Sequence, residues 1–385
     1  MPPLILRAQR VITPDETIEP GLVLTSAGII EAVGSALTAP DGAEVVDLPG
    51  QTLVPGFIDV HVHGGGGFSL ATSDPAEITA YSAWAPRHGV TSFLAGIVAR
   101  APSDAIPLME AALAAETPGA ELLGLNLEGP FVSPDRRGAL PPSWPAAPDA
   151  KTLDQLLDAA SGRLRLVTVA PELPGALNVI RRATAAAVRV SIGHTDARYE
   201  TALAGFQAGA SHVTHAFNAM RPFHHRDPGP VGAALDSPGV TIELIADGVH
   251  LHPATVRMLI GAFGPDRVAL ITDAVTPAGL DEGRFRLGGQ EARLQDGRVT
   301  LPDGTIAGSA ATMDDVVASI VRWGAATLTA ALRMAATVPA AVAGVAETKG
   351  RLAPGYDADI VALAPDLTVA ATWIRGNLTF QAQSG

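Results

Sequence analysis

The sequence predicts an α/β fold: a (β/α)8 TIM-like barrel with a small β-sandwich domain built from both chain ends. Eight short apolar runs alternate with alanine-rich stretches whose apolar residues recur at helical spacing. Continuous apolar runs are typical of parallel strands buried on both faces, and eight strand–helix units are the number that closes a barrel. The two chain ends instead show the alternation of half-buried strands. A chain of 385 residues, 47% of them hydrophobic, can build both parts.

Short strands with tight turns are expected at both ends of the chain. About 50 residues at the N-terminus contain the segments LILRAQRVIT, GLVLTSAGIIEAVG and AEVVDLPGQTLVP, which are bounded by Gly, Pro and Asp. The C-terminal segments GRLAPGYDADIVALAPD and LTVAATWIRGNLTF have the same character. We therefore predict that residues 1–53 and 351–385 form the small β-sandwich domain and that residues 54–350 form the barrel.

The eight predicted barrel strands follow one another at regular intervals. They are the runs at residues 53–60, 91–98, 122–127, 164–170, 188–193, 211–215, 241–246 and 267–272. The stretches between them, such as SDAIPLMEAALAAE, have the spacing of amphipathic helices. A glycine-rich segment with hairpin character at 285–304 is predicted as an insertion after the last strand. Two helical segments near 312–343 would complete the barrel.

The composition excludes several classes of function. The net charge is −13 and there are only two lysines, Lys151 and Lys349, so neither nucleic acid nor an anionic membrane is an expected partner. No cysteine is present, which rules out a disulfide framework, a cysteine nucleophile and a Cys-type zinc site. The N-terminal apolar stretch is too short for a signal peptide and no run is long enough to span a membrane, so we expect a cytoplasmic protein.

Titratable side chains follow six of the eight apolar runs. These groups are His61 with His63, Glu128, His194, His215, Asp247 with His250, and Asp273. Enzymes with this barrel build their active sites at the carboxyl ends of the strands, so the groups are expected to converge. His61 and His63 lie two residues apart and therefore on one face of a strand. The four glycines at 64–67 remove side-chain bulk beside them.

Four imidazoles and two carboxylates at one rim predict a metal centre. The set His61, His63, Glu128, His194, His215 and Asp273 suits zinc or a similar divalent ion that keeps one position open for water. Each residue alone has an ordinary explanation: a lone histidine is commonly a hydrogen-bonded core residue, and an aspartate after a strand is often a helix cap. All of them together at strand ends are not explained by capping and packing.

The motifs HVH (61–63), LEGPF (127–131), GHT (193–195), THAFNAM (214–220), DGVH (247–250) and TDA (272–274) resemble the amidohydrolase superfamily. Within it they resemble the N-acetylglucosamine-6-phosphate deacetylase family, over essentially the whole chain. The resemblance implies that Glu128, His194 and His215 hold one metal ion. It implies a second site completed by His61 and His63, so one or two ions per subunit, zinc first and Fe, Mn or Co as alternatives.

The resemblance also implies the remaining roles. Asp273 would be the general base and acid. The substrate, an amino-sugar phosphate, would be held by Asn218, Ala219, Met220, Arg226 and His250. Arg226 matches the family's phosphate-binding arginine, and a homodimer that shares the phosphate pocket is expected. Many amidohydrolases bridge two metals with a carbamylated lysine, but neither lysine ends a predicted barrel strand, so Glu128 is the candidate bridge.

One position departs from the family pattern. Leu140 stands where the family usually has a histidine that touches the substrate near its amide, and a leucine cannot polarise a carbonyl. Substrate identity is therefore open: the alternative is a related amidohydrolase that deacetylates another N-acyl amino sugar, such as N-acetylgalactosamine 6-phosphate. A cyclic-amide hydrolase fits the FNAM motif and Arg226 poorly. A non-catalytic binding protein would have no need of Asp273.

Overall fold

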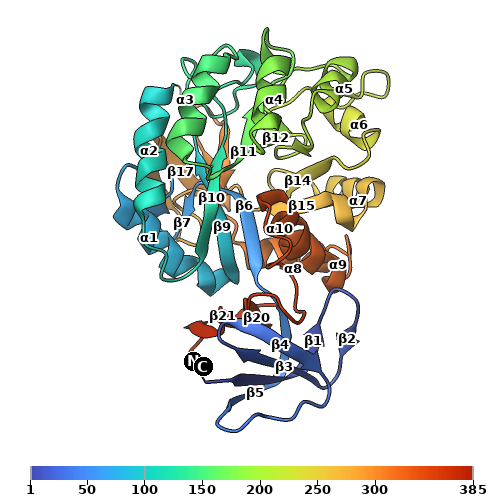
Figure 1. The fold of residues 1–385 in the computed structure, drawn as a ribbon. Helices are drawn as coiled ribbons and strands as arrows, with labels where there is room; N and C mark the ends of the chain where they lie inside the picture. The colour runs from blue at the N-terminus through green and yellow to red at the C-terminus, as the bar shows by residue number, and fades with distance from the viewer. Residues whose placement is uncertain (1, 99–100, 384–385) are drawn as a thin grey trace.

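The structure, a computed structural model, describes residues 2–98 and 101–383. Its centre is a parallel eight-stranded sheet that confirms the predicted barrel (Figure 1). In sheet order the strands are β6 (Phe57–Val62), β9 (Val90–Ile97), β10 (Glu121–Leu127), β11 (Leu164–Val169), β12 (Arg189–Ile192), β13 (His212–Val213), β14 (Thr241–Ile245) and β15 (Val268–Ile271). Each was predicted as an apolar run.

Backbone hydrogen bonds bring the first and last barrel strands together. The amide of Asp273, just after β15, donates to the carbonyl of His61 in β6 at 2.9 Å. The amide of His63 donates to the carbonyl of Ala274 at 2.8 Å. The barrel therefore closes at the level where the predicted ligands lie, and this closure sets His61 and Asp273 side by side.

Helices cover the outside of the barrel, as the alternating pattern predicted (Figure 1). They are α1 (Pro75–Trp84), α2 (Pro102–Ala114), α3 (Ala150–Ala160), α4 (Ala176–Ala185), α5 (Tyr199–Gln207), α6 (Gly229–Leu235), α7 (Pro253–Phe263) and α8 (Met313–Arg322). The helical segment that follows comprises α9 (Leu328–Leu332), a π-helical turn (Arg333–Thr337) and α10 (Val338–Ala343). Buried side chains of six barrel strands pack against α10 in a separate cluster that includes Ile58, Leu166 and Ile271.

The two chain ends form one small sheet domain, as predicted. Its strands are β1 (Leu4–Ile12), β2 (Thr17–Ile18), β3 (Gly21–Ser26), β4 (Ile29–Gly34), β5 (Glu44–Pro55), β20 (Ile360–Leu363), β21 (Val369–Ile374) and β22 (Asn377–Gln381). β5 joins the strands of the two chain ends into one sheet, because it pairs in parallel with β1 and antiparallel with β20. Leu6, Ile30, Leu53 and Trp373 belong to its own buried core. The exact domain boundaries stay predictions; β5 continues to Pro55.

A buried lysine joins the barrel to the C-terminal part of the small domain. Lys349 Nζ lies 2.9 Å from Glu121 Oε2, at the start of β10, and 2.9 Å from Asp357 Oδ2. It lies 2.7 Å from Asp359 Oδ2, one residue before β20. The Lys349 side chain is 3% exposed. One of the two lysines of the chain is therefore a structural ion-pair partner rather than a surface charge.

The inserted segment after β15 forms a small antiparallel sheet of its own. Its strands are β16 (Gly283–Leu287), β17 (Gln290–Gln295), β18 (Arg298–Thr300) and β19 (Ile306–Ser309), so the predicted hairpin extends to four strands. The amide of Ser309 donates to the carbonyl of Asp273 at 2.8 Å. Gln290 Nε2 donates to the carbonyl of Ala139 at 3.1 Å. These contacts hold the inserted sheet beside the carboxyl ends of the barrel strands.

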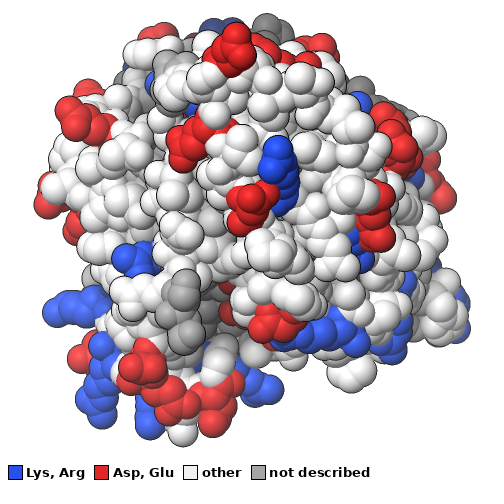
Figure 2. Space-filling model, turned by 90° about the horizontal axis from the view of Figure 1, so that it is seen from below, with Lys and Arg blue, Asp and Glu red and all other residues white. Residues whose placement is uncertain are grey.

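The surface carries charges of both signs. On the face seen from below, acidic and basic side chains are scattered among uncharged ones (Figure 2). The few basic residues are not gathered into one large patch on this face. Among the described helices, none is both long enough and apolar enough to cross a membrane.

Candidate active site

The carboxyl ends of the barrel strands bring the six predicted ligand residues into one buried cluster. His61 lies in β6, and the others lie one or two residues after the ends of β6, β10, β12, β13 and β15. Three of the six have left-handed backbone conformations: His194 (φ 46°), His215 (φ 27°) and Asp273 (φ 48°). Such conformations are unfavourable for residues with a Cβ and persist only where the surroundings hold them, which is common at functional sites.

Glu128 lies at the centre of the cluster and faces two pairs of histidines. Its Oε1 is 2.8 Å from His194 Nε2 and 2.9 Å from His215 Nε2. Its Oε2 is 3.0 Å from His63 Nε2 and 3.6 Å from His61 Nε2. Each carboxylate oxygen thus lies beside one pair of histidines, which is the geometry that a carboxylate bridging two ions requires.

Asp273 lies on the side of the cluster occupied by the β6 histidines. Its Oδ1 is 3.4 Å from His63 Nε2 and 3.6 Å from His61 Nε2. Two sets of donor atoms are close enough to surround an ion: His61, His63 and Asp273, and His61, Glu128 and His215. His61 belongs to both sets, so its position matters for either ion.

One buried ring nitrogen shows that the donor set fits a metal ion. His61 Nε2 is buried and has no hydrogen-bond partner among the described residues. The other ring nitrogen, Nδ1, already contacts Glu243 Oε2 at 2.8 Å. Because an unpaired buried polar atom is costly, a bare Nε2 that faces two carboxylates fits the position of a metal ligand.

The charges of the cluster also favour a cation. Burial acts to raise the pKa of Glu128, but the electrostatic interaction with His61 and hydrogen bonds from His194 and His215 hold it well below its usual range. Burial likewise acts against ionisation of Asp273, and the hydrogen bond from His63 brings its pKa below the usual value. No Lys or Arg among the described residues pairs with either carboxylate. A divalent ion would neutralise this buried negative charge.

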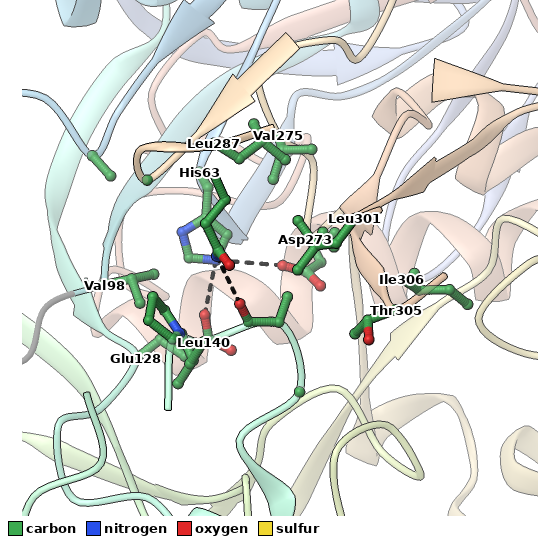
Figure 3. A pocket seen from close by; sticks show the side chains of 18 of the residues that line it. His63, Val98, Glu128, Leu140, Asp273, Val275, Leu287, Leu301, Thr305 and Ile306 are labelled. Atoms are coloured by element: carbon green, nitrogen blue, oxygen red, sulfur yellow. Dashed lines mark hydrogen bonds and ion pairs between the residues drawn. The ribbon is translucent and has the colours of Figure 1, made fainter. Parts of the chain in front are cut away.

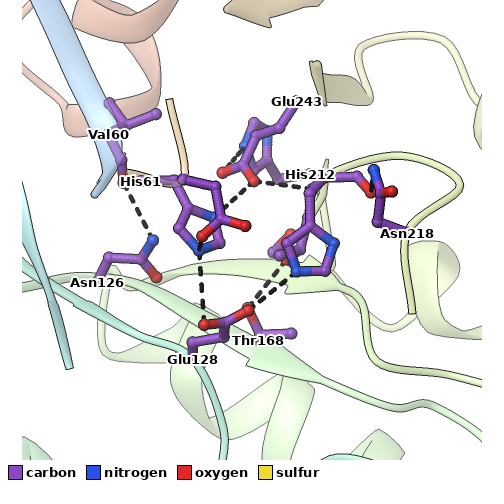
Figure 4. A network of polar contacts seen from close by, with 12 residues as sticks. Val60, His61, Asn126, Glu128, Thr168, His212, Asn218 and Glu243 are labelled. Atoms are coloured by element: carbon purple, nitrogen blue, oxygen red, sulfur yellow. Dashed lines mark hydrogen bonds and ion pairs between the residues drawn. The ribbon is translucent and has the colours of Figure 1, made fainter. Parts of the chain in front are cut away.

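Two buried carboxylates at this site were not predicted. Glu243 in β14 contacts His61, His212 and the backbone of His215 (Figure 4). Asp59 accepts a 2.5 Å hydrogen bond from Thr272 Oγ1, and burial raises its pKa to about 7. Both residues interrupt otherwise apolar strands, FIDV and TIELI. The sequence did contain a signal for both: a single carboxylate inside a buried strand needs a hydrogen-bond or charge partner, which indicates a polar contact in the core.

A pocket of about 750 Å³ opens over the cluster (Figure 3). His63, Glu128, His194, His215 and Asp273 lie in its wall. The inserted sheet supplies another part of the wall, including Arg286, Leu287, Leu301, Thr305 and Ile306. Leu140 also lines the pocket and is only 9% exposed. An aliphatic side chain therefore lies in the pocket wall at position 140, where the family resemblance predicts a histidine.

The predicted substrate-binding residues are only partly brought together. Asn218, Ala219 and His250 line the pocket, and Asp247 Oδ2 lies 2.7 Å from His250 Nδ1. Met220 is buried and is not among the lining residues; its sulfur accepts a hydrogen bond from the backbone of residue 217. Arg226 is exposed, outside the pocket wall, and its Nη1 lies 2.7 Å from His225 Nε2.

Comparison with known proteins gives consistent results. A model of the Amidohydrolase family matches residues 52–379. The N-acetylglucosamine-6-phosphate deacetylase of Bacillus subtilis (strain 168) is 34% identical over 98% of this chain and 97% of its own length. The N-acetylgalactosamine-6-phosphate deacetylase of Escherichia coli O157:H7 is 36% identical over 97% of this chain and 98% of its own length.

Solved structures show the same fold over the same span. A mutant of the N-acetyl-D-glucosamine-6-phosphate deacetylase from Mycobacterium smegmatis, in complex with N-acetyl-D-glucosamine-6-phosphate, is similar with a TM-score of 0.93 and 36% identity. The similarity covers 99% of this chain and 100% of that chain. The enzyme from Pasteurella multocida has a TM-score of 0.91 at 28% identity, over 98% and 99% of the two chains.

Proposed function

The chain belongs to the amidohydrolase family, and from this premise we propose that it hydrolyses the amide of N-acetylglucosamine 6-phosphate to glucosamine 6-phosphate and acetate. The observation that carries the proposal is the arrangement around Glu128, which places two histidines against each carboxylate oxygen at the wall of a substrate-sized pocket. Relatives that match nearly the full chain carry this activity in their names.

The metal ligands in this proposal are His61, His63, Glu128, His194 and His215. Glu128 would be shared between two ions, or would hold a single ion together with His194 and His215. Zinc is proposed first because imidazole and carboxylate donors suit it, with Fe, Mn or Co as alternatives. When bound, such an ion lowers the pKa of its water from 15.7 toward ~7 and polarises the amide carbonyl.

Asp273 moves the proton. Its backbone is fixed beside the pocket by two hydrogen bonds: the Asp273 amide donates to the carbonyl of His61, and the Asp273 carbonyl accepts from the amide of Ser309. With a lowered pKa its carboxylate is ionised and can accept the proton of the attacking water on one oxygen. It then delivers that proton to the amide nitrogen, because an amine leaves readily only when protonated.

The sugar phosphate is held by residues beyond the metal cluster. Asn218, Ala219 and His250 are positioned to contact it because they line the pocket. Arg226 lies outside the pocket of its own chain. We therefore propose a homodimer in which Arg226 of one protomer reaches the phosphate bound to its partner. We also propose that this homodimer is cytoplasmic. Met220 would act behind the wall by keeping the segment around residue 217 in place.

A second candidate substrate is N-acetylgalactosamine 6-phosphate. Leu140 in the pocket wall favours keeping it, because the group expected to touch the substrate near its amide is replaced by an aliphatic side chain. One full-length relative is named as a deacetylase of that sugar. The two sugars differ only in the orientation of one hydroxyl, which a pocket distinguishes by the hydrogen bonds it offers.

Acetate release tests the proposal. The assay compares N-acetylglucosamine 6-phosphate, its galacto epimer and the unphosphorylated sugar, on protein whose metal content has been measured. Fast release from the phosphorylated gluco sugar alone, lost on chelation and restored by metal, supports the proposed function. Faster release from the galacto epimer would make the second candidate correct. No release from any of them by metal-loaded protein would contradict both.

A further inference from the structure

Glu243 is a fully buried carboxylate that contacts both halves of the cluster (Figure 4) and is not among the residues that line the pocket. Its Oε2 lies 2.8 Å from His61 Nδ1 and accepts a 2.9 Å hydrogen bond from the backbone amide of His215. Its Oε1 lies 3.0 Å from His212 Nε2. A single side chain on β14 therefore connects β6, which carries His61, with His215, two residues after the end of β13.

The contact with His61 determines which ring nitrogen is free. A carboxylate beside Nδ1 favours the proton on that nitrogen, which leaves the lone pair on Nε2. His61 Nε2 is buried without a hydrogen-bond partner among the described residues, and it lies 3.6 Å from both Glu128 Oε2 and Asp273 Oδ1. The orientation of His61 toward the cluster thus depends on Glu243.

The contact with His215 acts on the other half of the cluster. His215 has an unfavourable backbone conformation (φ 27°), and the hydrogen bond from its amide to Glu243 helps to hold it. In that conformation His215 Nε2 lies 2.9 Å from Glu128 Oε1. His212 restrains Glu243 from the opposite side, because its second ring nitrogen lies 2.5 Å from Thr241 Oγ1.

We infer that Glu243 is a positioning residue that sets His61 and His215 together for metal binding. This inference rests on the proposed function only in requiring a metal ion. Carboxylates that hold a ligating histidine typically contribute 10–100-fold to metal affinity. Glu243 contacts one histidine from each pair around Glu128, so its loss weakens metal binding rather than one substrate contact.

The test is metal affinity in the absence of substrate. Glu243→Gln keeps the shape and one acceptor but brings an NH₂ group against a donor, whereas Glu243→Leu removes both acceptors. Each variant is stripped, reloaded with Co²⁺, titrated against a competing chelator and examined by visible absorption. We expect affinity about 10–100-fold below wild type, with Leu below Gln, and a changed cobalt spectrum.

Thr214→Val is the matched control. Thr214 is buried beside His215, and its hydroxyl contacts Ser191 and Thr168 but no cluster residue. The Thr214→Val variant should therefore have the metal affinity of the wild type. Unchanged affinity and spectrum in Glu243→Gln would overturn the inference, as would an equal loss in Thr214→Val.

Wild-type protein provides a second measurement if the variants fail to fold. In ¹⁵N-labelled zinc-loaded protein, with His61 assigned by comparison with His61→Gln, the His61 ring proton should be on Nδ1 and exchange slowly. A proton on Nε2 would overturn the inference. Failure of the proposed function is distinguishable, because it appears as absent deacetylation by protein whose metal affinity still responds to Glu243.

Discussion

Replacing Lys349 with methionine should destabilise the protein strongly without touching the active site. Its ammonium group lies within 3 Å of the carboxylates of Glu121, Asp357 and Asp359, and the latter two side chains are 9% and 6% exposed. Removing one partner of a buried ion pair typically costs 3–5 kcal/mol, because the opposite charge stays buried. Arg375 Nη2, 3.5 Å from Asp357 Oδ2, compensates in part. We therefore expect a loss of about 3 kcal/mol in the free energy of unfolding.

Urea unfolding followed by fluorescence and circular dichroism measures this effect, and Lys151→Met is the natural control. Lys151 is the only other lysine and is exposed at the start of α3, so its variant should lie within about 0.5 kcal/mol of wild type. A loss below about 1 kcal/mol in Lys349→Met would refute the reasoning.

The pH dependence gives an independent check with a defined sign. Burial raises the pKa of Asp359 even with Lys349 present, and without the lysine it should rise further. A carboxyl group whose pKa is higher in the folded state binds its proton more tightly there, so acid favours folding. The loss in the free energy of unfolding of Lys349→Met relative to wild type should therefore become smaller as the pH falls from about 8 toward about 5. A constant loss would contradict this explanation.

Three further predictions concern the active site. Asp273→Asn should lower kcat by about 10²–10⁴ while the metal content stays that of wild type, because an amide cannot accept the proton; unchanged turnover would remove Asp273 from this role. Arg226→Ala should raise KM for the phosphorylated sugar and leave metal content and the activity on the unphosphorylated sugar unchanged; an unchanged KM would contradict the phosphate assignment. Leu140→His should raise kcat/KM for the phosphorylated gluco sugar, because an imidazole can polarise the amide carbonyl and a leucine cannot; an unaltered kcat/KM would show that Leu140 does not limit turnover.

The barrel could be predicted because each of its strands overlaps a continuous apolar run of the sequence. Even the run at 211–215, where only His212–Val213 pairs as a strand, was placed correctly. The cluster of titratable residues was predictable for a related reason. A barrel collects strand ends at one rim, so the titratable residues at the ends of these runs were expected to lie together without any knowledge of distances.

Other residues could not be predicted because their partners are remote in sequence. Glu243 lies 182 positions from His61, and the segment TIELI contains no pattern that indicates His61 as its partner. The pocket wall contributed by the inserted sheet depends on how that sheet packs. Motif matching gave the positions of Met220 and Arg226 but not their directions, and the structure places neither in the pocket wall.

The pairing of β5 with β20 has a consequence for how the protein is made. Pro55 pairs with Ile360, about 300 residues later in the chain. At synthesis rates of about 5–20 residues per second, this edge of β5 waits roughly 15–60 s for its neighbour. During translation β5 has β1 on one side and an open edge on the other, and open edges pair readily with other chains. The yield of folded enzyme in a cell should therefore depend on what shields this edge on the ribosome.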